Sequence, residues 1–129
     1  MAEDGLAHRV EAMWSAYSGG GLDAFLAQCD ADVEWRPHGA GDRVLHGSDE
    51  LRAFFARQHA LGERREPTIY AIEQHGETVL LTGALRIVRR GQLIESQLAW
   101  VYRFADGRLC SATSYATRAE ALRAVAVVV

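Results

Sequence analysis

The feature that most constrains the fold is a pair of long runs with alternating apolar residues, 79–89 and 92–104, separated only by Arg90 and Gly91. A two-residue connection that ends in glycine is typical of a tight β-hairpin. Residues that lie opposite each other in such a hairpin share one face of the sheet. The turn therefore predicts both an antiparallel pair and its register, with Leu81 opposite Trp100.

This register divides the hairpin into two unlike faces. The first is large, apolar and aromatic, and it carries Val79, Leu81, Gly83, Leu85, Ile87, Ile94, Ser96, Leu98, Trp100, Tyr102 and Phe104. The second is smaller and mixed, with Leu80, Thr82, Ala84, Arg86, Glu95, Gln97, Ala99, Val101 and Arg103. We expect the first face to pack against helices. Because the second face is too apolar to be fully solvated, we expect it to form a subunit interface.

Two further turn signals, His75-Gly76 and Asp106-Gly107, extend the hairpin to a four-stranded antiparallel meander that begins at residue 67. The first of these turns places Thr68, Tyr70 and Ile72 on the apolar face. The second turn leaves two registers open for the last strand. A two-residue turn would direct Leu109, Ser111, Thr113 and Tyr115 inward, and a three-residue loop with a bulge would direct Cys110, Ala112 and Ser114 inward.

The N-terminal half predicts helices around one short strand. Apolar residues spaced as on one helix face indicate a helix over 3–18, followed by a second helix over 22–29. Residues 33–36 predict a strand, and 37–47 a loop. A third helix is expected to start with Ser48 as its N-cap. At the other end of the chain, Thr117 and Glu120 have the spacing of a capping box for a small terminal helix.

Composition narrows the functional classes. A chain of 129 residues predicts one domain, and a net charge of -3 with a pI near 5.9 argues against a nucleic-acid partner. The acidic N-terminus and the lack of an apolar run of about 20 residues predict a cytoplasmic protein with no membrane partner. The five histidines lack metal-ligand spacing, so we expect no metal and no cofactor. Cys29 and Cys110 are expected to be two buried thiols, and a disulfide between them is the less favoured alternative.

The order of elements and three local motifs resemble the nuclear transport factor 2-like superfamily, in its SnoaL-like and ketosteroid-isomerase-like branch. The motifs lie at residues 31–37 (ADVEWRP), 47–55 (GSDELRAFF) and 101–109 (VYRFADGRL), with Tyr115 beyond them. The resemblance implies a single α+β domain over 1–129, in which a cone-shaped, curved, mostly antiparallel sheet wraps around N-terminal helices. It also implies a pocket on the concave face and a homodimer, and it favours the bulged register for the last strand.

The resemblance can be tested against the family's known catalytic groups. The isomerase branch uses a carboxylate base, a tyrosine and a protonated aspartate. None of the matching positions here carries the required group: Trp35 stands in place of the base, Met13 or Trp14 in place of the tyrosine, and Trp100 in place of the aspartate. The epoxide-hydrolase branch needs an inward arginine between aspartates, but the register turns Arg86 outward. The cyclase branch needs an acidic base, and the inward face of the meander carries none.

The candidate site is therefore aromatic. We expect a pocket for a small apolar molecule lined by Trp14, Tyr17, Trp35, Phe54, Phe55, Leu81, Leu98, Trp100, Tyr102 and Ser114. His38 and Tyr70 are the candidate catalytic groups, His38 because an imidazole titrates near neutral pH. A small-molecule-binding protein is the favoured function. The alternatives are a cyclase-like or isomerase-like enzyme acting by proton transfer on a small apolar carbonyl compound, and an interaction module whose function is its dimer.

Overall fold

The computed structural model describes residues 5, 8–15, 21–37 and 43–128. Its helices comprise residues 8–15, α2 (Leu22–Leu26), α3 (Gly47–Ala60) and α4 (Arg118–Val128). Its strands are β1 (Cys29–Arg36), β2 (Leu45–His46), β3 (Glu63–His75), β4 (Thr78–Arg89), β5 (Gln92–Ala105) and β6 (Arg108–Tyr115). Among these described residues, no helix has both the length and the apolar character needed to cross a membrane.

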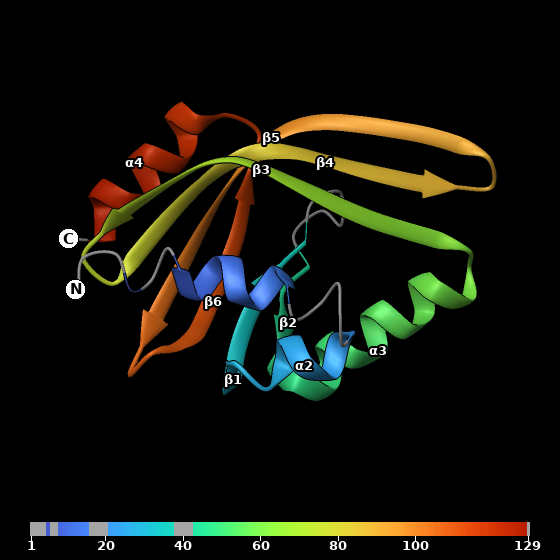
Figure 1. Ribbon diagram of the computed structural model, residues 1–129, viewed down its shortest axis with the longest axis horizontal. Coiled ribbons are helices and arrows are strands. Elements are labelled where there is room, and N and C mark those ends of the chain that lie inside the picture. The colour runs from blue at the N-terminus through green and yellow to red at the C-terminus, as the bar shows by residue number, and fades with distance from the viewer. Residues whose placement is uncertain (1–4, 6–7, 16–20, 38–42, 129) are drawn as a thin grey trace.

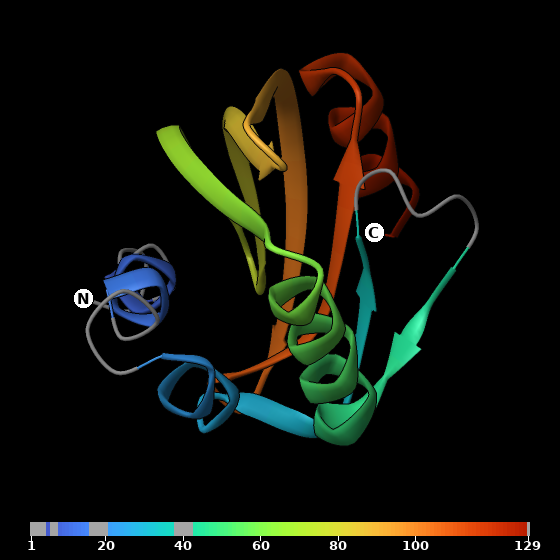
Figure 2. The same cartoon turned by 90° about the vertical axis from the view of Figure 1, so that its right-hand side faces the viewer.

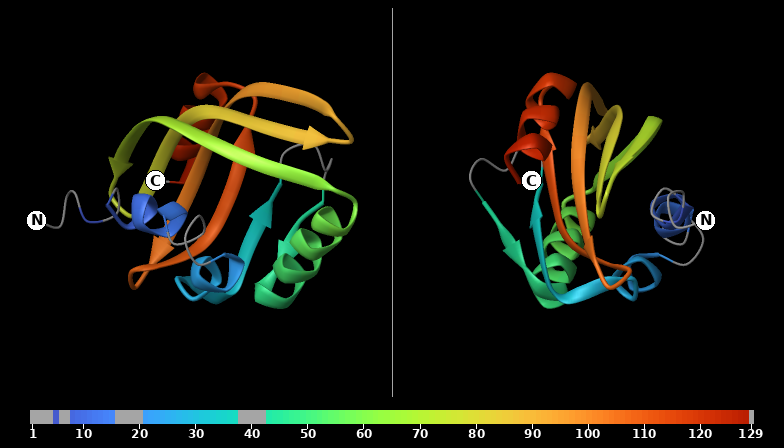
Figure 3. Two further views of the ribbon diagram at one scale, coloured as in Figure 1. Left: turned by 45° about the vertical axis from the view of Figure 1, so that its right-hand side comes forward. Right: turned by 90° about the vertical axis from the view of Figure 1, so that its left-hand side faces the viewer.

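The strands form one curved sheet in the order β2-β1-β6-β5-β4-β3 (Figure 1). β3 to β6 make the expected antiparallel meander, and β1 joins its edge parallel to β6. The N-terminal helix and α3 lie on the concave side of the sheet, and α4 lies on the opposite side (Figures 2 and 3). This arrangement confirms the predicted fold class, a curved sheet wrapped around N-terminal helices.

The register of the central hairpin is confirmed. Leu81 lies opposite Trp100, and Arg86 lies opposite Glu95. Arg90 and Gly91 form the two-residue turn with φ angles of 49° and 80°. Positive φ at both positions defines a type I′ turn, whose twist matches that of the flanking strands. The turn chemistry therefore sets which side chains of β4 and β5 face the concave side.

A β-bulge in β3 corrects the expectation for Thr68 and Tyr70. Ile69 pairs with Gly83 and Ala71 pairs with Thr82, so the bulge leaves Tyr70 without a partner of its own on β4. The extra residue moves the preceding part of the strand by one position. Ile69, not Thr68, therefore shares a face with Gly83, and Tyr70 is 60% exposed.

The last strand combines features of both registers that the sequence left open. Ala105 pairs with Arg108 across a two-residue turn, so Leu109 faces inward beside Phe104. A register shift then follows, after which Ala112 lies opposite Tyr102 and Ser114 lies opposite Trp100. The tight turn and the bulge occur together, and this places Ala112 and Ser114 on the concave face.

The N-terminal half differs from the expectation in its boundaries. The first strand is longer than predicted, and β2, in a segment expected to be a loop, pairs with its end. α3 begins at Gly47, with His46 and not Ser48 at the N-cap position. The carboxylate of Glu50 accepts a hydrogen bond of 2.8 Å from the His46 backbone N–H, which satisfies an amide that has no partner within the helix.

Two apolar clusters lie on the two faces of the sheet. The larger fills the concave side. On the convex side, Leu80, Ala99 and Val101 pack against Ala121 and Val125 of α4. The expectation that a second subunit covers this surface is therefore wrong for the part that α4 occupies, and a homodimer through the rest of the face stays a prediction. One of the two hydrogen bonds of the predicted capping box of α4 is confirmed, because the Glu120 N–H donates a 3.1 Å hydrogen bond to the Thr117 hydroxyl.

Candidate functional site

A cavity of about 50 Å³ lies between the concave face of the sheet, the N-terminal helix and α3. Its walls are mostly aromatic and aliphatic. They consist of Trp14, Trp35, Arg36, Pro37, Phe54, Phe55, Arg65, Pro67, Ile69, Leu85, Trp100, Tyr102 and Ala112. We call the aromatic members of this set, namely Trp14, Trp35, Phe54, Phe55, Trp100 and Tyr102, the aromatic cage.

Ring contacts hold the cage together. The Trp35 ring centroid lies 6.0 Å from that of Tyr102 and 6.4 Å from that of Phe55. The Phe54 and Phe55 rings pack edge to face with their centroids 5.6 Å apart, and the Trp14 and Phe25 ring centroids lie 5.0 Å apart. Tilted and edge-to-face pairs at such distances are favourable arrangements for aromatic rings. The cage is therefore a packed wall built from the N-terminal helix, β1, α3 and the centre of the sheet.

The polar groups of the cavity are few. Burial raises the pKa of Tyr102, and a hydrogen bond with the Trp14 side chain acts in the opposite direction. The Tyr102 hydroxyl is therefore protonated at neutral pH and can take part in hydrogen bonds. Arg36 and Arg65 are the charged residues of the lining, and Arg36 is exposed on β1 between the buried Trp35 and Pro37. The described lining contains no Asp, Glu, His or Cys.

Arg65 is held in place by two kinds of contact. Its Nε lies 3.4 Å from a carboxylate oxygen of Glu63, and its guanidinium lies 5.7 Å from the centre of the Phe54 ring. Burial lowers the pKa of Arg65, and the positive charge of Arg89 acts in the same direction, whereas Glu63 raises it. The ion pair and the ring contact therefore fix a cation at one edge of the aromatic cage.

The structure brings six of the predicted pocket residues together as the aromatic cage. Leu81 and Leu98 are buried in the same apolar cluster, behind the cavity wall. Ser114 lies on the concave face of β6, where its hydroxyl donates a 3.4 Å hydrogen bond to the Arg36 carbonyl. The expectation that Tyr70 faces the pocket is wrong, since the bulge exposes it. Tyr17 and His38 lie outside the described residues.

Sequence reasoning missed the charged and aliphatic half of the lining. Arg65, Pro67 and Ile69 alternate along β3, and every second residue of a strand faces the same side. The strand was expected to begin at residue 67 with the opposite face inward. The alternating run from Glu63 to Ile69 would have shown the correct face if it had been read as strand from its start.

No group of three or more His, Cys, Asp or Glu side chains within the described ranges is placed to hold a metal ion. The two cysteines are free. Cys29 is buried, as expected, whereas Cys110 is only partly buried. The chemistry available among the described lining residues is apolar and aromatic contact, hydrogen bonding by the Tyr102 phenol and the three indoles, and ion pairing by the Arg65 guanidinium.

Comparison with known proteins assigns the family. The sequence profile of the SnoaL-like domain matches residues 10–112, which is most of the chain. The protein therefore belongs to the SnoaL-like domain family. No curated protein matches the sequence.

Solved structures with the same fold are distant in sequence. A nuclear transport factor 2-like protein of unknown function from Burkholderia pseudomallei superposes with a TM-score of 0.75 at 23% identity, covering 92% of this chain and 95% of its own. An LEH-like epoxide hydrolase from M. tuberculosis superposes with a TM-score of 0.76 at 17% identity, covering 95% of this chain and 85% of its own. A hypothetical protein with a ketosteroid isomerase-like fold from Catenulispora acidiphila, in complex with trimethylamine, superposes with a TM-score of 0.71 at 21% identity, covering 83% of each chain.

Proposed function

We propose that this SnoaL-like protein binds a small, flat, largely apolar molecule in the aromatic cage. The observation that carries the proposal is the convergence of the cage: all three tryptophans of the chain, from three separate elements, line one cavity. Ligand pockets are typically apolar and aromatic walls with a few placed polar groups. The Tyr102 hydroxyl and the Arg65 guanidinium are the polar groups that would orient a ligand here.

The size of the cavity limits the ligand. A single water needs about 10–15 Å³ of cavity volume, so about 50 Å³ accommodates a few water molecules. A larger ligand would require Phe55, which is only partly buried, to change its rotamer. We therefore expect single-ring aromatic or alicyclic compounds to bind better than fused polycyclic ones.

The tryptophans provide the assay. Because Trp14, Trp35 and Trp100 are the only tryptophans and all line the cavity, intrinsic fluorescence reports ligand binding at the cage with no background from elsewhere. We expect phenol, benzaldehyde and cyclohexanone to change the emission in a saturable manner. The dissociation constant should decrease as the apolar surface area of the compound increases. Absence of a saturable change across single-ring compounds would contradict the proposal.

A matched pair of variants separates the cage from the surface. Ile69→Phe adds volume to a residue that lines the cavity, whereas Tyr70→Phe changes the adjacent, exposed residue. We expect Ile69→Phe to lower the affinity at least about tenfold by filling the available space, which corresponds to about 1.4 kcal/mol. Tyr70→Phe should bind as the wild type does. Equal affinities for both variants would place the ligand elsewhere.

Proton-transfer catalysis remains an alternative that depends on His38. The described lining offers no carboxylate or imidazole, so a base would have to come from outside it. If turnover of a carbonyl compound is found, His38→Ala should abolish it. Unchanged turnover in that variant would exclude His38 as the base.

A further inference from the structure

A second, open cavity of about 490 Å³ adjoins the aromatic cage and is lined mainly by arginine. It lies where the C-terminal end of α3 meets the start of β3 and the turn between β4 and β5 (Figure 1). Its charged residues are Arg43, Arg57, Glu63, Arg65, Arg89 and Arg90. Five guanidiniums and one carboxylate leave four positive charges in excess, in a protein whose overall net charge is -3.

Glu63 organises two of these arginines and neutralises only one charge. It is 7% exposed, and it is the only buried charged residue in the described part of the chain. Its Oε1 accepts a 2.7 Å hydrogen bond from Arg89 Nε, and its Oε2 lies 3.4 Å from Arg65 Nε. Antiparallel pairing places Glu63 directly opposite Arg89. The pair of guanidiniums is therefore fixed in position by a buried anion and by the strand ladder.

The remaining arginines are exposed around this fixed pair. Among the described residues, neither Arg57 nor Arg90 makes an ion pair with a carboxylate. Arg43 contacts the Phe54 ring at 5.4 Å, and Arg65 contacts the same ring at 5.7 Å. A concave surface lined by one sign of charge concentrates ions of the opposite sign.

We propose that this arginine-lined cavity binds the phosphate of a small phosphate ester or diphosphate. A planar guanidinium can donate two parallel hydrogen bonds to a phosphate, and a group with two or more negative charges matches the excess better than a single carboxylate does. The buried Glu63 holds Arg65 and Arg89 at the cavity, so these two side chains lose less freedom when the anion binds.

The two cavities share Phe54 and Arg65 as common walls. A ligand with an apolar ring in the aromatic cage could therefore place a phosphate among the arginines without a long linker. This second step rests on the proposed function of the cage, whereas phosphate binding in the arginine-lined cavity does not. The geometry thus predicts that the preferred ligand joins both groups, as an aryl or alicyclic phosphate does.

Inorganic pyrophosphate tests the arginine-lined cavity alone. We expect the full-length protein to bind it in isothermal titration calorimetry at low ionic strength, with an affinity that falls as salt is added. The double variant Arg57→Gln/Arg90→Gln should bind it at least about tenfold more weakly, since it loses two charge-assisted contacts. Both positions are exposed, and an unchanged melting temperature would show that the fold is retained.

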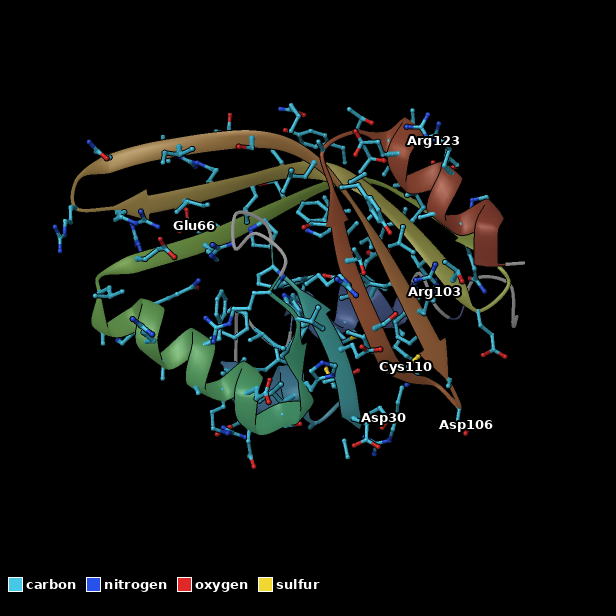
Figure 4. The ribbon with its side chains drawn as sticks, turned by 180° about the vertical axis from the view of Figure 1, so that it is seen from behind. Asp30, Glu66, Arg103, Asp106, Cys110 and Arg123 are labelled. Carbon is cyan, nitrogen blue, oxygen red and sulfur yellow. The ribbon has the colours of Figure 1, made fainter. Side chains whose placement is uncertain are left out.

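The matched control removes the same charge from outside the cavity. Arg64 is exposed next to Arg65 but pairs with Val88 on the opposite face of the sheet, and Arg123 lies on α4, away from α3 (Figure 4). Arg64→Gln/Arg123→Gln should change the affinity for pyrophosphate by less than about twofold. Failure of the wild type to bind pyrophosphate, or an equal loss in both double variants, would overturn the proposal.

Phenyl phosphate then tests the link between the two cavities. We expect it to bind at least about tenfold more tightly than inorganic phosphate or phenol, because one molecule contributes both sets of contacts. Ile69→Phe should remove this advantage without changing pyrophosphate affinity. If phenol fails to bind while pyrophosphate binds, the proposed function of the cage is wrong and the anion site stands. If phenyl phosphate binds no more tightly than phosphate, the two sites are not used together.

Discussion

The carbonyl oxygen of Thr68 lies where Gly83 would carry a side chain. A β-carbon built on Gly83 would come within 1.9 Å of that oxygen and 3.1 Å of the Ile69 α-carbon. Both clashing atoms are backbone, so neither can move without disturbing the strand pair. The bulge that exposes Tyr70 and directs Ile69 into the aromatic cage therefore depends on a glycine opposite it on β4.

Replacement of Gly83 should accordingly destabilise the protein. We expect Gly83→Ala to lower the free energy of unfolding by at least about 2 kcal/mol, measured by urea denaturation, because the methyl group forces β3 and β4 apart. Gly5→Ala is the control, since Gly5 is helical and a β-carbon there meets nothing within 4 Å. That change should be neutral or slightly stabilising. A Gly83→Ala variant as stable as wild type would show that the bulge has a different geometry.

The ion pairs of Glu63 give a second prediction, in which stability and ligand binding change in opposite directions. Glu63→Gln removes the buried charge between Arg65 and Arg89, which should lower the free energy of unfolding by about 2–4 kcal/mol. The same change removes one negative charge from the arginine-lined cavity, so the affinity for pyrophosphate should rise. Urea denaturation and calorimetry measure the two effects on one sample.

Glu66→Gln serves as the control for this prediction. Glu66 is exposed on the same strand (Figure 4) and pairs with Arg86 on the convex face, so its loss should alter neither quantity by much. If Glu63→Gln weakens pyrophosphate binding, the carboxylate supports the site chiefly by holding the arginines in place, and the electrostatic part of the argument is wrong.

Buried acidic groups predict a loss of stability at alkaline pH. Burial raises the pKa of the Cys29 thiol from 9.0 to about 12, although the charge of Arg108 acts in the opposite direction. Burial also raises the pKa of Tyr102. The unfolded chain therefore releases the Cys29 proton at a lower pH than the folded chain does. This contribution to stability is complete below about pH 9 and declines between pH 9 and pH 12.

Substitution of the thiol should reduce this dependence. Between pH 8 and pH 11, we expect the free energy of unfolding of Cys29→Ala to fall by less than that of the wild type, with a difference on the order of 2 kcal/mol. Cys110→Ala is the comparison, because this thiol is only partly buried. Chemical denaturation at several pH values gives the profiles. Parallel profiles for Cys29→Ala and the wild type would mean that the thiol ionises normally in the folded state.

The turn chemistry explains why the central hairpin could be predicted from the sequence. Arg90-Gly91 is a two-residue connection between two alternating runs, and such a turn permits one register only. Every pairing from Arg89–Gln92 to Thr78–Arg103 follows from it. The two cage residues on the sheet were predictable for the same reason, because Trp100 and Tyr102 alternate on β5 and thus share the concave face.

Bulges limited the rest of the site. A bulge reverses the face of the sheet to which every residue on one side of it points. The residue types of the bulged strand alone do not reveal where the bulge lies. Tyr70 was placed inward because the alternation was extended through the bulge from Ile72. The evidence for the bulge was on the neighbouring strand, where Gly83 is the one small residue among the large apolar side chains on the concave face of β4. The arginine-lined cavity was missed because its charges come from four separate segments of the chain, which only the tertiary structure brings together.

The last prediction concerns the cover that α4 provides for the convex face. Ala121 is fully buried against the strands that carry Leu80, Ala99 and Val101. A charge at this position cannot be solvated while the helix is docked, so Ala121→Asp should release α4 and expose an apolar strip of β4 and β5. We expect a loss of about 2–4 kcal/mol in stability and self-association visible by analytical ultracentrifugation. Ala119→Asp is the matched control, since Ala119 is exposed on the same helix. If Ala121→Asp retains the stability and the association state of the control, α4 is not required to cover the sheet.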